Sequence, residues 1–156
     1  MLRVPQRIPG VPDRDTYTYT WCHGAAGTPA DLESACLRSL RASGVPERLY
    51  PGFWDNDGRC CGTAGVGDIV LSAWQRHGRD EDLNFAVVLG DALVARAVDD
   101  GDHAYWRFVE HRKDDPLLPP GPGWMQGAAG IGAWFLHLDA FERGAAPPIR
   151  FPDSPF

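Results

Sequence analysis

Apolar residues recur every three or four positions in four stretches of the chain, and this spacing predicts four helices. The stretches cover residues 29–43, 66–77, 80–98 and 131–141. Thr28 and Pro29 are typical of an N-cap and a first helical position. Gly44, Gly78 and Gly101 follow the first three stretches, where a glycine commonly ends a helix. The pattern therefore predicts an all-α protein.

The segments between these stretches are rich in residues that break helices. Residues 45–58 and 114–123 carry many Pro, Gly and Asp residues and are predicted to be loops. The proline-rich tail, 145–156, is expected to wrap the surface without forming an element. For the aromatic run at 105–109, the pattern leaves an extended strand and an irregular segment equally open.

Three segments of the chain resemble one another. Trp21 to Gly27, Arg59 to Gly65 and Trp124 to Gly130 each end in a Gly-x-Ala-Gly turn that leads into an apolar stretch. The recurrence predicts helical hairpins whose tight glycine turns gather at one end.

Length and charge exclude several classes of protein. A chain of 156 residues makes one ordinary domain or part of a larger one. Its net charge of −6 gives no basic footprint for nucleic acid or an anionic membrane. The N-terminus has no apolar core of a signal peptide, and the longest apolar stretch, 127–136, is too short to span a bilayer. We therefore expect a cytoplasmic protein.

The placement of the cysteines suggests a metal. When the repeats are aligned, Cys22 matches Cys60, and His23 matches Cys61, so two turns carry thiols just before a helix. If the turns converge, Cys22, Cys60 and Cys61 can meet around one zinc ion and leave its fourth position open. The alternative is that these cysteines are simply buried, as free cysteines often are. Cys36, on the apolar face of the first stretch, is most simply a core residue.

These motifs resemble the lanthionine synthetase C-like (LanC-like) family. The resemblance rests on Trp21-Cys22-His23-Gly24, on Cys60-Cys61-Gly62 and on the run from Gly123 to Gly132, in that order. It extends from about Tyr19 to the closing Pro152 to Phe156.

The resemblance implies a fold and a division of the chain. Members of the family form an α/α toroid of seven helical hairpins with zinc at one mouth. Residues 1–18 would be an N-terminal extension or linker, 19–144 a partial toroid carrying the zinc, and 145–156 a tail. About three hairpins fit in this length, so the chain is expected to be a C-terminal half, whether truncated, a split subunit or a miniature.

The resemblance also implies the zinc ligands, which are Cys22, Cys60 and Cys61. Many members have histidine at the position of Cys61. Three thiolates give the zinc site a net charge of −1, where two thiolates and an imidazole give zero. The extra charge makes a bound substrate thiolate more nucleophilic.

The activity that the resemblance implies is zinc-dependent cyclisation of a peptide. A cysteine thiolate of a dehydrated precursor peptide would add to dehydroalanine or dehydrobutyrine. Two alternatives stay open: a zinc-binding scaffold or split subunit that is inactive alone, and thiol addition between separate molecules such as glutathione and an activated alkene. The expected partners are the precursor peptide and an N-terminal half or a second copy of the chain.

The reaction needs a general acid to protonate the enolate. In the family, the proposed aspartate and histidine precede the first zinc motif, and this chain starts almost at that motif. His23 is therefore the candidate catalytic residue, with a purely structural hydrogen bond as its alternative. The other candidates have less specific expected roles: His111 lining the cavity, His77 and His103 in solvent, His137 in packing or partly exposed, and Trp21 and Trp124 in packing or at the mouth.

An arc of a toroid would leave apolar helix faces uncovered. The stretch from Asp80 to Val98 is apolar nearly all round, so we expect it to lie between neighbours. Phe85, Val88 and Leu89 are predicted to form an exposed stripe that favours association with a second copy or an N-terminal fragment.

Overall fold

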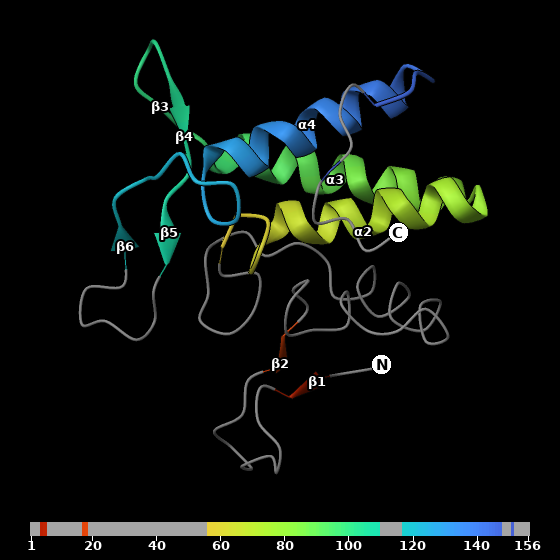
Figure 1. Cartoon of the computed structure of the whole chain (residues 1–156), viewed down its shortest axis with the longest axis horizontal. Helices are drawn as coiled ribbons and strands as arrows, with labels where there is room; N and C mark the ends of the chain where they lie inside the picture. The colour runs from red at the N-terminus through yellow and green to blue at the C-terminus, as the bar shows by residue number, and fades with distance from the viewer. Residues whose placement is uncertain (1–3, 6–16, 19–55, 110–116, 148–150, 152–156) are drawn as a thin grey trace.

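The computed structural model describes residues 4–5, 17–18, 56–109, 117–147 and 151 (Figure 1). In this part of the chain, helices α2 (Thr63–His77), α3 (Asp80–Arg96) and α4 (Ala128–Glu142) make up most of the regular structure. The strands are two residues long and form three antiparallel pairs. They are β1 (Val4–Pro5) with β2 (Tyr17–Thr18), β3 (Val98–Asp99) with β4 (Ala104–Tyr105), and β5 (Phe108–Val109) with β6 (Leu117–Leu118). The described part of the chain is mostly helical, in agreement with the predicted all-α class. The helix predicted over 29–43 lies outside the described residues.

The described helices pack side by side, and α3 runs antiparallel to both α2 and α4 (Figure 1). Gly78 and Arg79 alone separate α2 from α3, which makes these two helices a tight hairpin. Gly78 has the left-handed backbone (φ 63°) expected at a helix end, and its N–H donates to the Trp74 carbonyl at 2.7 Å. The predicted end of this stretch near Gly78 is thus confirmed, whereas the helix begins at Thr63, three residues before the predicted stretch. No helix of the described segments is long and apolar enough to cross a membrane.

The core lies where α2 faces its two neighbours. Its largest completely buried apolar side chains come from all three helices: Val66, Val70, Leu71, Leu89, Leu93, Ile131 and Trp134. The helices are therefore held together by the apolar faces that the periodicity predicts.

The end of α3 differs from its prediction. The helix stops at Arg96, and Gly101 belongs to the loop of the β3–β4 hairpin, where it has φ 97°. The Gly101 N–H donates to Asp99 Oδ1 at 2.8 Å, and the His103 N–H donates to Asp100 Oδ1 at 2.9 Å. Aspartates that bond to nearby backbone favour turns over helix, which explains the early stop.

The predicted exposed stripe on α3 is wrong for two of its three members. Phe85 and Leu89 are buried in the core, whereas Val88 is 49% exposed. Positions 85 and 89 lie four residues apart and share a face, while Val88 is rotated about 100° from Leu89 around the helix axis. Val94 is also exposed, at 63%, so among the described residues the neighbours of α3 cover one face of the helix.

The aromatic run at 105–109, which the sequence left undecided, is extended in two places. Tyr105 ends β4, and Phe108 begins β5. Trp106, between them, donates from Nε1 to the Leu93 carbonyl at 2.8 Å. This bond fastens the strand segments to the last turn of α3.

The second and third repeats form the same loop at the start of a helix. The N-cap glycines have nearly the same extended backbone, with φ −146° and ψ −169° at Gly62 and φ −131° and ψ −167° at Gly127. Each helix then has a glycine on which a carbonyl packs directly. A Cβ built on Gly65 would lie 1.8 Å from the Arg59 oxygen, and one on Gly130 would lie 1.9 Å from the Trp124 oxygen. Only glycine permits this approach.

The contact at Gly130 yields a test within a single helix. We expect Gly130→Ala to lower the free energy of unfolding by about 2 kcal/mol, because the carbonyl of Trp124 must move away from the new methyl group. Gly132→Ala is the control, since a Cβ there meets nothing within 4 Å. It should raise stability by roughly 0.5–1 kcal/mol through helix propensity. Urea denaturation of both variants measures the difference, and equal effects would contradict the close approach.

Candidate functional site

The adjacent thiols of Cys60 and Cys61 lie in the turn that precedes α2. The Cys61 Sγ is 3.3 Å from the Cys60 Sγ, and both residues are half-buried. Both sulfurs are thus near enough to act on one ligand, and solvent reaches both residues.

Backbone hydrogen bonds define the shape of this turn. The Thr63 N–H donates to the Asn56 carbonyl at 3.0 Å, and the Ala64 N–H donates to the Asp57 carbonyl at 3.1 Å. These bonds occupy amides of the first turn of α2 that would otherwise lack a partner. The Cys60 N–H donates to the Met125 carbonyl at 2.8 Å and so ties the turn to the loop before α4. The second and third repeats are therefore in direct contact.

Arg59, the residue before the cysteine pair, has a buried charged side chain. Its Nη2 lies 3.0 Å from Asp68 Oδ2, and the two side chains are 3% and 7% exposed. The guanidinium also lies against the rings of Trp124 and Phe151, with distances of 5.3 Å and 4.0 Å to the ring centroids. A buried guanidinium is stable only when charge and ring partners replace water. Arg59 is thus fixed between α2 and the residues that follow α4.

The imidazole of His137 completes this cluster from the side of α4. It stacks on the Phe151 ring with centroids 3.6 Å apart and planes at 3°, and its Nδ1 lies 4.0 Å from Asp68 Oδ1. His137 is 8% exposed, so the predicted packing role agrees with its surroundings. Phe151, at 4% exposure, shows that the predicted surface tail sends at least this ring into the interior.

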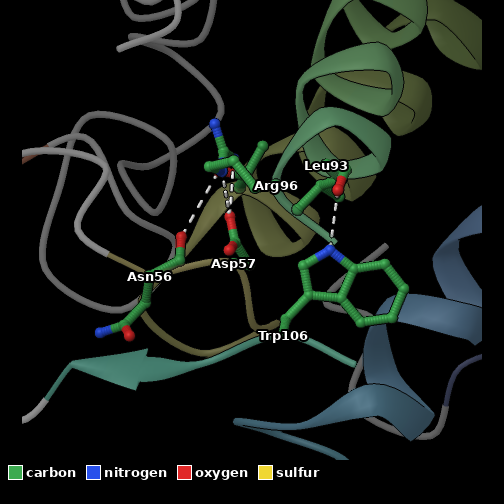
Figure 2. Close-up of polar contacts among 6 residues, drawn as sticks. Asn56, Asp57, Leu93, Arg96 and Trp106 are labelled. Atoms are coloured by element: carbon green, nitrogen blue, oxygen red, sulfur yellow. Dashed lines mark hydrogen bonds and ion pairs between the residues drawn. The ribbon is translucent and has the colours of Figure 1, made fainter. Parts of the chain in front are cut away.

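A second ion pair, between a buried carboxylate and a half-buried guanidinium, joins the same loop to α3 (Figure 2). Arg96 donates from Nε to Asp57 Oδ1 at 2.7 Å and from Nη2 to Thr63 Oγ1 at 2.8 Å. Burial raises the pKa of Asp57 above its ordinary value of 3.8, and the charge and hydrogen bond of Arg96 only partly oppose this effect. The cysteine turn is therefore held between one buried and one partly buried ion pair.

The structure describes only part of the predicted site. Cys22, His23 and the further candidates Trp21, Cys36 and His111 lie outside the described residues. Within the described segments, no group of three or more His, Cys, Asp or Glu side chains is arranged to hold a metal. The three-cysteine zinc site therefore stays a prediction, with two of its members described.

Three other predicted positions can be checked. His77 and His103 are exposed, as the sequence indicated. Trp124 is half-buried and meets the Phe151 ring edge-on at 5.5 Å, which is a packing contact.

Sequence reasoning missed the two ion pairs around the thiols. Asp68 was the available signal, because it is the only charged residue between Gly62 and Leu71, in an otherwise apolar helical stretch. A lone carboxylate on such a face needs a buried cation. No comparable feature of the sequence pointed to its partner Arg59, to Arg96 or to Phe151.

Comparison with known proteins does not identify the chain. No family model matches it, and no curated protein matches it.

The raised pKa of Asp57 predicts a pH dependence of stability. Between its ordinary value and the raised one, the folded chain holds more protons than the unfolded chain, so the contribution of Asp57 to stability falls as pH rises. Asp57→Asn removes this titration while keeping an acceptor for Arg96. We expect the free energy of unfolding, parent minus variant, to be greatest below about pH 3.8, to decline as the pH rises, and to reach a plateau once the pH exceeds the raised pKa of Asp57. Urea denaturation across this range measures it, and a difference that increases with pH would refute the prediction.

Proposed function

We propose that this chain is a LanC-like protein that binds zinc through Cys22, Cys60 and Cys61 and promotes the addition of a peptide cysteine to a dehydrated residue. The observation that carries the proposal is the paired thiols of Cys60 and Cys61, 3.3 Å apart and half-buried in a turn that backbone hydrogen bonds hold in place. The order of the glycine motifs along the chain is the reason for proposing this family.

The distance between the thiols is compatible with zinc. Two sulfurs on a tetrahedral zinc, each at about 2.3 Å from the metal, lie about 3.8 Å apart. Cys60 and Cys61 reach that separation by a change of about half an ångström, which rotation about their side-chain bonds provides. Cys22, in the turn that aligns with theirs, is the proposed third ligand.

The chemistry follows from the charge of the ligands. When bound, zinc would lower the pKa of a substrate thiol and hold it as a thiolate. The three cysteine thiolates would leave the site with a net charge of −1, which favours release of the substrate sulfur toward an electrophile. The substrate sulfur would bond to the β-carbon of dehydroalanine, the double bond would become an enolate, and a proton would then reach the α-carbon. His23, next to Cys22, is the proposed donor of that proton.

The proposed wider architecture is an arc of an α/α toroid. The common loop geometry before α2 and α4 supports a repeated hairpin unit, as does their shared direction in Figure 1. In this proposal, residues 19–144 form the arc and a dehydrated precursor peptide is its partner.

Metal analysis tests the zinc site. The purified chain should contain about one zinc per molecule, because three thiolates and one open position complete a tetrahedral site. Exchange of both Cys60 and Cys61 for alanine should remove the zinc, and Cys36→Ala, the control, should leave it in place. A double variant that keeps its zinc would refute the assignment.

A peptide assay tests the reaction. When a dehydrated peptide with one cysteine is added, we expect free thiol to disappear at unchanged peptide mass, because cyclisation neither adds nor removes atoms. A gain in mass by the amount of glutathione would instead indicate addition between molecules. If neither change occurs while zinc is bound, the chain alone is a scaffold and cyclase activity of the isolated chain is refuted.

A further inference from the structure

The ring of Phe151 is buried between two side chains from different elements. One of its faces stacks on His137 of α4, with the rings parallel to within 3° and 3.6 Å apart. The guanidinium carbon of Arg59 lies 4.0 Å from the centroid of the same ring. Phe151 thus connects the chain beyond α4 to the residue that directly precedes Cys60.

Arg59 and the residue after it are tied to α2 and to the loop before α4. Its guanidinium pairs with Asp68 on α2 at 3.0 Å, and its carbonyl packs against the Cα of Gly65. The next residue, Cys60, bonds through its N–H to the Met125 carbonyl at 2.8 Å. A displacement of Arg59 would therefore move the backbone that carries both thiols.

The flat ring is what makes this arrangement stable. An aromatic face attracts a guanidinium and also stacks on an imidazole, whereas an aliphatic side chain of similar size does neither. Arg59 is 3% exposed, so water cannot replace the lost partner without opening the loop.

We propose that Phe151 is a positioning residue for the Cys60–Cys61 thiol pair, acting through Arg59. Phe151 holds the turn against α4 so that the two sulfurs bind one soft ion as a preformed chelate. The zinc in this role rests on the proposed function, but the preformed dithiol does not.

The experiment compares Phe151→Leu with Phe85→Leu. Both replace a phenylalanine that is at least nine-tenths buried, but Phe85 packs in the helix core on α3. Zinc affinity is measured for the parent chain and both variants in a buffer in which circular dichroism shows that all three are folded. We expect Phe151→Leu to weaken zinc binding roughly 10- to 100-fold, which is the usual effect of removing a group that orients metal ligands. Phe85→Leu should remain within about threefold of the parent, below that range.

A second measurement follows the thiols without zinc. Phenylarsine oxide binds a pair of thiols by forming two As–S bonds and releasing one water, with no change in oxidation state. In a chain that also carries Cys22→Ala and Cys36→Ala, only the pair remains to bind it. Competition with dithiothreitol should show that Phe151→Leu loses arsenical affinity by roughly tenfold and that Phe85→Leu does not.

The two measurements separate the positioning role from the proposed function. If the parent binds the arsenical but no zinc, and Phe151→Leu weakens arsenical binding, the positioning role stands and the zinc proposal fails. If zinc binds but the two leucine variants lose affinity equally in both measurements, Phe151 contributes only to general stability and the inference is overturned.

Discussion

The described fold depends on the approach of a loop carbonyl to a glycine at the start of a helix. At Gly65 and at Gly130, the oxygen six residues earlier occupies the place where any other residue would have its Cβ. This approach folds each loop back onto its own helix, so that loop carbonyls accept hydrogen bonds from the first helical amides. Both loops fold back in this way, and the cysteine turn contacts its counterpart before α4 through the hydrogen bond from Cys60 to the Met125 carbonyl.

Helix positions followed from the sequence because they depend on local rules. The apolar spacing located α2, α3 and α4, and glycine marked the end of α2. The end of α3 was missed because Asp99 and Asp100 stabilise a turn through their side chains, which competes with continued helix. The spacing of apolar residues does not reveal that competition.

The surroundings of the thiols could not be predicted in the same way. The spacing of the motifs singled out Cys60 and Cys61, but the groups that hold their turn come from distant parts of the chain. Arg96 reaches Asp57 from the end of α3, and Phe151 reaches Arg59 from beyond α4. Which cation joins which carboxylate depends on how the helices pack, and a single sequence shows only that a buried charge such as Asp68 must have a partner.

The likeness of the two loops also bears on how such a protein evolves. The contacts that shape each loop are made by backbone groups and glycines, and the positions of Cys60 and Cys61 in one loop are taken by Met125 and Gln126 in the other. A loop of this shape therefore accepts very different side chains at the same two positions. Reactive groups can therefore be gained or lost by point mutation with little penalty to folding, which leaves selection free to alter the chemistry of one repeat while the scaffold is inherited unchanged.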